Sequence, residues 1–256
     1  MALLLFLLPL NLYALTIATY NVQNHFDNNP SKNAQLERVI KAMGYPEFLA
    51  LQEVESTRSL SKFTNYKIIM AQIRDKRGMG VALLYRKGKL LKKRELKVAN
   101  SRSILEARIK LENSTFTFFV VHWPSQRNPP NKRIQAAKTL IKRIRELENE
   151  YFVILGDFNY DPDFESIPSM EMRGIVNLDF NGGTYFYIPY RRWSKFDRIL
   201  WSRNFKGIYE YKIFQPDFIA KQMIYNGRPE KIPWRYDAKK HVGYSDHFPV
   251  YLKFHL

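Results

Sequence analysis

Carboxylates, amides and imidazoles recur in this sequence where short apolar segments begin or end. Such side chains can bind a divalent cation, position a water molecule and transfer a proton. The chain has no cysteine, so any metal must bind oxygen and imidazole ligands. This composition is what magnesium-assisted phosphoryl chemistry requires. The segments are TYN with Asn21, LQE with Glu53, VVH with His122, GDFN with Asp157 and Asn159, FDRIL with Asp197, and SDHF with Asp246 and His247.

Taken singly, each of these motifs has an ordinary structural explanation. A glutamate after an apolar strand, such as Glu53, is usually a solvated strand end, and an Asp-Phe-Asn sequence such as 157–159 is usually a turn. His25 and His255 are interpreted as surface or packing residues. Groups at strand ends in α/β structures gather at one edge, so six separate segments could build one site.

The sequence predicts that the segments carrying these side chains form many short strands and few helices. β-rich and apolar runs predict strands, and apolar residues at helical spacing predict helices. We find no internal repeat or flexible linker, which favours a single domain of packed sheets covered by helices. The predicted strands are 15–21, 48–54, 80–85, 104–111, 116–122, 151–155, 196–201 and 248–254, and the predicted helices are 34–43 and 132–148.

The ordered motif series resembles the endonuclease/exonuclease/phosphatase superfamily over nearly the whole chain, from Leu15 to Leu256. GDFN combined with SDHFP near the carboxyl end is the most specific part of the resemblance. It implies an α/β fold, a four-layer sandwich of two central mixed β-sheets flanked by helices, with the site at one edge. It also implies Mg²⁺ as the cofactor, with Mn²⁺ or Ca²⁺ as alternatives.

The resemblance assigns metal-binding and water-positioning roles to residues from four segments. Glu53 looks like the main metal carboxylate, with Asn21 and Asp246 beside the same cation or its waters. Asp157 and Asn159 look like the groups that orient the attacking water and hold the phosphate.

The same resemblance makes both histidines of the motif series catalytic. His247 would be oriented by Asp197 through its second ring nitrogen, and His122 would face the leaving group. Pancreatic-type deoxyribonucleases pair the equivalent of His122 with a glutamate, but the corresponding place near Met79 offers no carboxylate. Asp75 is the nearest candidate partner, which leaves the protonation of His122 open.

The formal net charge of +17 and the pI near 9.9 predict attraction to polyanions, of which nucleic acid is the commonest. A basic proteome or a solubility requirement would produce the same surplus. Basic residues cluster in 86–97, which looks like a hairpin, and in 132–145, which is also explained as a solvated helix face. The candidate substrate contacts are Arg102 and Arg133 for phosphate, and Tyr185 and Trp193 for base stacking, although aromatic residues more often pack.

The amino terminus, residues 1–14, resembles a signal peptide and leaves 15–256 as the catalytic domain. Its apolar run is too short for a confident membrane span, so no integral span is expected in the mature chain. We therefore expect export, to the periplasm or outside the cell. Two features weaken this interpretation, because no basic residue precedes the run and Leu12 is not small; the chain would be cytoplasmic if this segment is not a signal.

Three functions are compatible with these patterns. The first is a magnesium-dependent nuclease of low sequence specificity, in which basic flanks hold phosphates without reading bases. The second is a phosphatase or phosphodiesterase that acts on inositol phosphates or phospholipid headgroups. The third is a non-catalytic binding module, which is disfavoured because every motif position keeps a competent residue. No stable protein partner is evident, and we expect a monomer.

Overall fold

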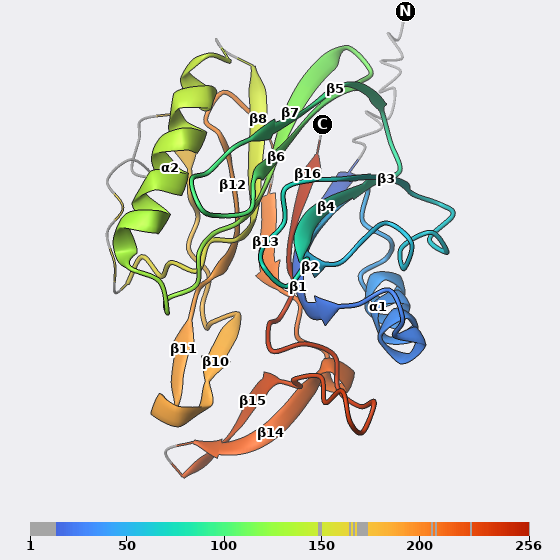
Figure 1. The fold of residues 1–256 in the computed structure, drawn as a ribbon, viewed down its shortest axis with the longest axis vertical. Helices are drawn as coiled ribbons and strands as arrows, with labels where there is room; N and C mark the ends of the chain where they lie inside the picture. Colours follow the sequence, from blue (N-terminus) through green and yellow to red (C-terminus); the bar gives the residue numbers. More distant parts are fainter. Residues whose placement is uncertain are drawn as a thin grey trace, which may run out of the picture.

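Two six-stranded β-sheets form the centre of the computed structural model, which describes residues 14–147, 150–163, 165, 167, 174–205, 207, 209–225 and 227–255 (Figure 1). The first sheet has the order β13-β16-β1-β2-β4-β3. Its β1 and β2 are parallel, whereas its other neighbours are antiparallel. The strands are β1 (Ala14–His25), β2 (Phe48–Val54), β3 (Lys67–Met70), β4 (Gly80–Tyr85), β13 (Tyr209–Ile213) and β16 (Val250–His255).

The second sheet has the order β5-β6-β7-β8-β12-β9 and is also mixed. Its β7 and β8 are parallel, and β12 runs antiparallel to β8. The predicted pair of mixed sheets is thus confirmed. The strands are β5 (Lys89–Leu96), β6 (Ile104–Leu111), β7 (Ser114–His122), β8 (Tyr151–Asp157), β9 (Ile175–Val176) and β12 (Asp197–Ser202).

Apolar side chains between the two sheets form the central core. Phe48 from the first sheet stacks on Phe118 from the second, with ring centroids 4.4 Å apart. These strands are apolar over most of their length because their sheets are covered on both faces.

One α-helix covers the outer face of each sheet in the described part of the chain, which completes the predicted four layers. Helix α1 (Pro30–Ala42) packs on the first sheet and α2 (Pro130–Arg145) on the second. Both helices begin earlier than predicted, each at a proline whose fixed φ suits the first turn. Neither has the length and apolarity that a bilayer-crossing helix requires.

Two small hairpins extend from the same end of the molecule, in the lower part of Figure 1. They consist of β10 (Tyr185–Tyr187) with β11 (Arg192–Ser194), and of β14 (Ala220–Tyr225) with β15 (Arg228–Pro233). The short helices η2 (Ile188–Tyr190) and η3 (Asp217–Ile219) adjoin them. The predicted signal segment 1–14 lies outside the described residues except for Ala14, where β1 begins.

Candidate active site

The predicted site residues meet at one edge shared by both sheets. Strands β1, β2, β7 and β8 carry their polar side chains near their carboxyl ends. Strand β12 runs in the opposite direction and begins at this edge with Asp197. In the sheet register His122 lies opposite Asp157, which in turn lies opposite Asp197. The expected convergence is therefore observed.

A close approach of β7 and β8 brings two of these residues together. Gly156 on β8 has a φ of +145°, and a Cβ atom there would lie 2.0 Å from the carbonyl oxygen of Val121. Only glycine lets the two backbones approach this closely. The next residue on each strand, His122 and Asp157, faces the site.

His247 and Asp197 form a buried imidazole–carboxylate pair. The Nδ1 atom of His247 lies 2.6 Å from Oδ2 of Asp197. Burial disfavours the charged imidazole, but the negative charge of Asp197 outweighs this effect and raises the pKa of His247 to about 10. His247 is therefore an imidazolium at neutral pH, and its Nε2 atom lies 4.0 Å from Asp157 Oδ2.

Asp157 lies at the centre of the cluster and accepts several hydrogen bonds. Asn21 Nδ2 donates to Oδ2 over 2.9 Å and the backbone N–H of Asn159 donates to Oδ1 over 2.8 Å. Burial raises the pKa of Asp157 to about 7, although the charge of His247 opposes this increase. A carboxylate with this pKa can accept a proton near neutral pH.

His122 is held by an arginine and not by a carboxylate. Arg102 Nη1 lies 2.5 Å from Nδ1 of His122, and the same Nη1 lies 3.4 Å from Asp75 Oδ2. Asp75, the nearest candidate partner in the sequence, thus contacts His122 only through Arg102. The sequence could not show this, because Arg102 approaches from a segment 20 residues away.

The arginine fixes both the charge and the tautomer of His122. A guanidinium group has only donors, so Nδ1 must be the acceptor and the ring proton lies on Nε2. That Nε2 lies 3.3 Å from Asp157 Oδ2. Burial lowers the pKa of His122 well below its usual value, and the charge of Arg102 lowers it further. His122 is a neutral hydrogen-bond donor.

Glu53 reaches the same cluster from the other sheet through an irregular strand end. Its φ is +63°, and the pairing of β2 with β4 shifts register between Gln52 and Val54. Such bulges re-aim a side chain, and strained φ values are concentrated at functional sites. Glu53 Oε1 lies 4.0 Å from His122 Nε2 and 3.1 Å from Arg77 Nη2. Arg77 was not expected at the site, and no local sequence pattern indicates it.

The segment before β16 is tied to the end of β1. The hydroxyl group of Ser245 donates to the carbonyl oxygen of Asn21 over 2.6 Å, which fixes the position of the following Asp246 and His247. Asp246 Oδ1 lies 4.0 Å from His247 Nε2, and Arg235 bonds the other oxygen of Asp246 over 2.8 Å. Neither Ser245 nor Arg235 was predicted.

The donor set fits a hard divalent cation. Glu53 and Asp157 approach the same nitrogen of His122, so carboxylates from both sheets meet there. The buried group Asp157, Asp197 and His247 also has a metal-site composition, with its ligand atoms within 4.8 Å of one another. However, the Nδ1 atom of His247 is taken by Asp197, and an imidazolium cannot ligate. The oxygens around Glu53 are the better position for a cation.

Two of the four residues predicted to contact the substrate, Arg133 and Trp193, form hydrogen bonds with other residues of the protein. Arg133 is 3% exposed, and its guanidinium group bonds Glu165 and the carbonyl oxygen of Ser125, which holds the loop after β7. Trp193 donates from Nε1 to Glu230 over 2.9 Å. Buried Arg133 is thus not available to a substrate, which corrects that expectation, whereas half-buried Trp193 uses its Nε1 and its ring for contacts within the protein.

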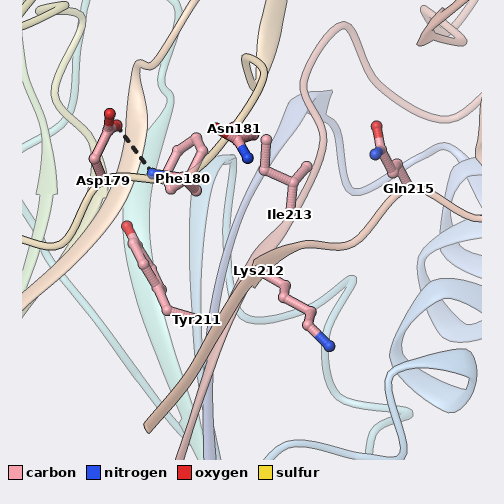
Figure 2. A pocket seen from close by; sticks show the side chains of 7 residues that line it. All are labelled: Asp179, Phe180, Asn181, Tyr211, Lys212, Ile213 and Gln215. Carbon is pink, nitrogen blue, oxygen red and sulfur yellow. Dashed lines mark hydrogen bonds between the residues drawn. The ribbon is translucent and has the colours of Figure 1, made fainter.

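The other two predicted contacts lie beside the catalytic cluster. Arg102 bonds His122, and the ring of half-buried Tyr185 lies 4.9 Å from that of His247, between centroids. A separate pocket of about 490 Å³ lies beside β13 (Figure 2). It is not the active site, because none of its lining residues belongs to the cluster; they are Asp179, Phe180, Asn181, Tyr211, Lys212, Ile213 and Gln215.

A comparison with protein families agrees with this geometry. The family model described as Endonuclease/Exonuclease/phosphatase family matches residues 18–247. The chain belongs to this family. Members of the endonuclease/exonuclease/phosphatase family are hydrolases of phosphate esters or phosphodiesters and depend on divalent metal ions. A sequence search of curated proteins gave no match.

Solved structures with the same fold include members of the endonuclease/exonuclease/phosphatase family with several names. A truncated Caenorhabditis elegans TDP2 is 16% identical, with a TM-score of 0.71 over 95% of this chain and 98% of that chain. A Bacteroides thetaiotaomicron mannosyl-6-phosphatase is 18% identical, with a TM-score of 0.68 over 93% and 98%. Danio rerio TDP2 complexed with a single-strand DNA product is 16% identical, with a TM-score of 0.67 over 95% and 99%. At these identities the likeness shows the fold alone.

Proposed function

We propose that this protein is an exported, magnesium-dependent nuclease of low sequence specificity. The observation that carries the choice of substrate is the net charge of +17 of the chain, which attracts polyanions. The basic residues hold phosphates and leave base edges unread. The apolar segment 2–8, a few residues before β1 in the sequence, supports export.

The proposed cation site consists of Glu53, Asn21 and Asp246. A cation bound there would neutralise charge on the phosphodiester. Asp157 accepts the proton of the attacking water, since its pKa of about 7 suits this task. Asn159 holds the carboxylate of Asp157 in place through its backbone N–H.

The two histidines donate to the phosphate with different charges. His247 is an imidazolium oriented by Asp197, and it stabilises the negative charge that develops on the phosphate oxygens. His122 donates from Nε2 as a neutral group. His122, which was expected to face the leaving group, thus acts by hydrogen bonding and not as an acid.

The function is tested with the protein from Leu15 onward on supercoiled plasmid, linear DNA, RNA and phosphorylated inositols, with and without chelator. We expect metal-dependent plasmid nicking. Glu53→Ala and Asp157→Ala should each abolish turnover and leave the fold intact, because both side chains belong to the polar cluster and not to the apolar cores. Circular dichroism checks the fold, and retained activity in either clean variant would contradict the site.

A phosphatase or phosphodiesterase acting on small phosphorylated molecules or lipid headgroups is the second candidate. The shared fold with a protein named mannosyl-6-phosphatase favours it. Release of phosphate or headgroup without any cleavage of nucleic acid would decide for this candidate. Amino-terminal sequencing of the mature protein tests export, and an intact Met1 on cytoplasmic protein would contradict it.

A further inference from the structure

The β10–β11 hairpin carries a row of tyrosine rings that begins at His247. The centroid of Tyr185 lies 4.9 Å from that of His247. The Tyr187 ring follows at 6.5 Å from Tyr185, with its plane within 21° of parallel, and Tyr190 lies 5.3 Å beyond Tyr187. Tyr187 is 38% exposed and Tyr190 is 76% exposed. The row thus runs from the catalytic cluster into solvent.

The opposite face of the hairpin fixes its position. Successive residues of a strand point to opposite faces, so Phe186 points away from the tyrosine row. Phe186 is buried and packs edge-on against Trp193 across the hairpin, with centroids 5.0 Å apart. Trp193 stacks on Phe248 and donates to Glu230 of β15. The exposed tyrosines therefore lie on a supported surface.

The spacing of the rings is close to twice that of stacked bases. Alternate residues on one face of a strand are about 6.6–6.8 Å apart, which is twice the roughly 3.4 Å step between neighbouring bases of a strand. The observed 6.5 Å between Tyr185 and Tyr187 is close to this value. Every second base of a stacked strand can therefore meet a tyrosine ring while the bases keep their usual step of roughly 3.4 Å.

The charge around the row is suited to a nucleic-acid backbone. Residues 184–194 include Arg191 and Arg192 and no acidic residue. Burial and the charge of Asp246 raise the pKa of the Tyr185 hydroxyl group, and the charges of Arg235, which is paired with Asp246, and of Arg127 oppose this increase. Aromatic rings flanked by basic groups are the usual means of binding single strands.

We propose that Tyr185, Tyr187 and Tyr190 form a stacking platform for unpaired bases of a single-stranded nucleic acid, next to the phosphate that is cleaved. Paired bases of a duplex already stack on one another, so the platform favours single strands or frayed ends. This inference rests on the proposed nuclease function and adds the substrate class. A membrane anchor is the other use of exposed aromatic residues, but it does not require a row that starts at the catalytic imidazole.

The test compares kcat/KM for a short single-stranded oligonucleotide with kcat/KM for the same strand carrying abasic nucleotides around the cleaved position. The wild-type protein should prefer the strand with bases. In the double variant Tyr187→Ala/Tyr190→Ala this preference should fall roughly 5- to 150-fold for each base that loses a stacking partner. A blunt duplex of the same sequence should show a smaller effect.

Two variants serve as controls. Tyr187→Phe/Tyr190→Phe keeps the rings and should keep the preference, which separates stacking from hydrogen bonding by the hydroxyl groups. Leu91→Ala removes an exposed apolar side chain on β5, 47% exposed, and should leave the preference at the wild-type value. Circular dichroism and thermal unfolding confirm that each variant is folded.

The outcomes separate this inference from the function on which it rests. An unchanged preference in the folded alanine variant overturns the platform while the nuclease function stands. Absence of nucleic-acid cleavage by the wild-type protein overturns both. Loss of binding to phosphatidylserine vesicles in the alanine variant, with nucleic-acid cleavage unaffected, would assign the tyrosines to a membrane surface.

Discussion

His122 and His247 flank the same carboxylate, Asp157, yet differ in charge because of their second neighbours. An arginine contacts Nδ1 of His122, whereas a carboxylate contacts Nδ1 of His247. The first arrangement keeps the ring neutral and the second keeps it protonated. Two identical side chains are thus prepared for different tasks within one site.

The neutral state of His122 leads to a prediction about its pH dependence. His122→Ala should lower kcat by about 100- to 1,000-fold, the usual loss when one donor to a developing oxyanion is removed. Both limbs of the pH–rate profile should remain, because His122 does not titrate in the working range. Loss of one limb would instead identify His122 as a proton-transferring acid.

Arg102→Met offers a related variant, because it removes the donor to Nδ1 and keeps the bulk of the side chain. Asp75 retains Arg77 as a partner, so no carboxylate is left unpaired. The ring of His122 then loses its fixed tautomer. We expect a smaller fall in kcat than for His122→Ala, and a larger fall would indicate that Arg102 itself contacts the phosphate.

Asp197 and His247 should act as a unit on the rate. His247→Ala should cost about two to four orders of magnitude, and the Asp197→Asn/His247→Ala double variant should cost little more, because the role of Asp197 passes through His247. Rates on one substrate for both single variants and the double variant check this. Additive losses would show that the two residues act separately.

The same pair predicts an alkaline limit of activity. The pKa of His247 is raised to about 10, so its charge is present below that pH and is lost as the pH rises through it. Asp197→Asn removes the charge that raises this pKa, and the alkaline limb should therefore move to lower pH. An alkaline limb that stays in place in Asp197→Asn would contradict the assignment.

The site residues at strand ends could be predicted from the sequence, but the arginines that contact them in the site could not. Asn21, Glu53 and Asp157 each follow an apolar run, which is a local signal. Arg77 and Arg102 lie in loops. Their contacts, Arg77 with Glu53 and Arg102 with His122, depend on how distant segments pack. The misassignment of Arg133 has the same cause, since its partner Glu165 lies 32 residues away.

At the scale of elements, the irregular ends of strands matter more than their regular parts. Glu53 lies at a register shift of β2, and Gly156 lets β8 approach β7. Both features turn or move side chains toward the edge. Asp197 reaches the same edge as the first residue of β12, because this strand runs antiparallel to β8.

Gly156→Ala should weaken both the fold and the site. The added Cβ atom would meet the carbonyl oxygen of Val121 at 2.0 Å, which forces β7 and β8 apart. We expect a loss of about 1–3 kcal/mol of unfolding free energy. Chemical denaturation measures this loss. Gly44→Ala is a matched control, because Gly44 also has a positive φ but no atom within 4 Å of the added Cβ atom.

Long apolar strands were predictable, whereas short edge strands were not. The predicted strands 48–54, 80–85 and 104–111 agree with β2, β4 and β6. Strands β9, β10 and β11 have only two or three residues, too few to show an alternating pattern. The helix predicted to begin at residue 34 begins at Pro30, because Asn29 caps it by accepting from the N–H of Lys32.

At the scale of the whole molecule, the surplus of positive charge should control substrate affinity. Binding of single-stranded DNA to the Glu53→Ala variant should weaken steeply with salt; if about five phosphates are contacted, log K should fall with log salt concentration with a slope of roughly −3.5. Fluorescence anisotropy at several salt concentrations measures this slope. A flat response would show that the basic surface does not hold the substrate, and would favour the small-molecule alternative.

The pairing of β1 with β16 has a consequence for synthesis of the protein. Residues 14–19 pair with residues 250–255, so the centre of the first sheet stays incomplete until β16 has left the ribosome. The same pairing brings Asn21 and Glu53 to Asp246 and His247, which lie just before β16. A nascent chain that lacks β16 therefore leaves Asp246 and His247 without their place in the active site. The cell that makes this hydrolase is therefore exposed to its activity only after β16 has been synthesised and has paired with β1.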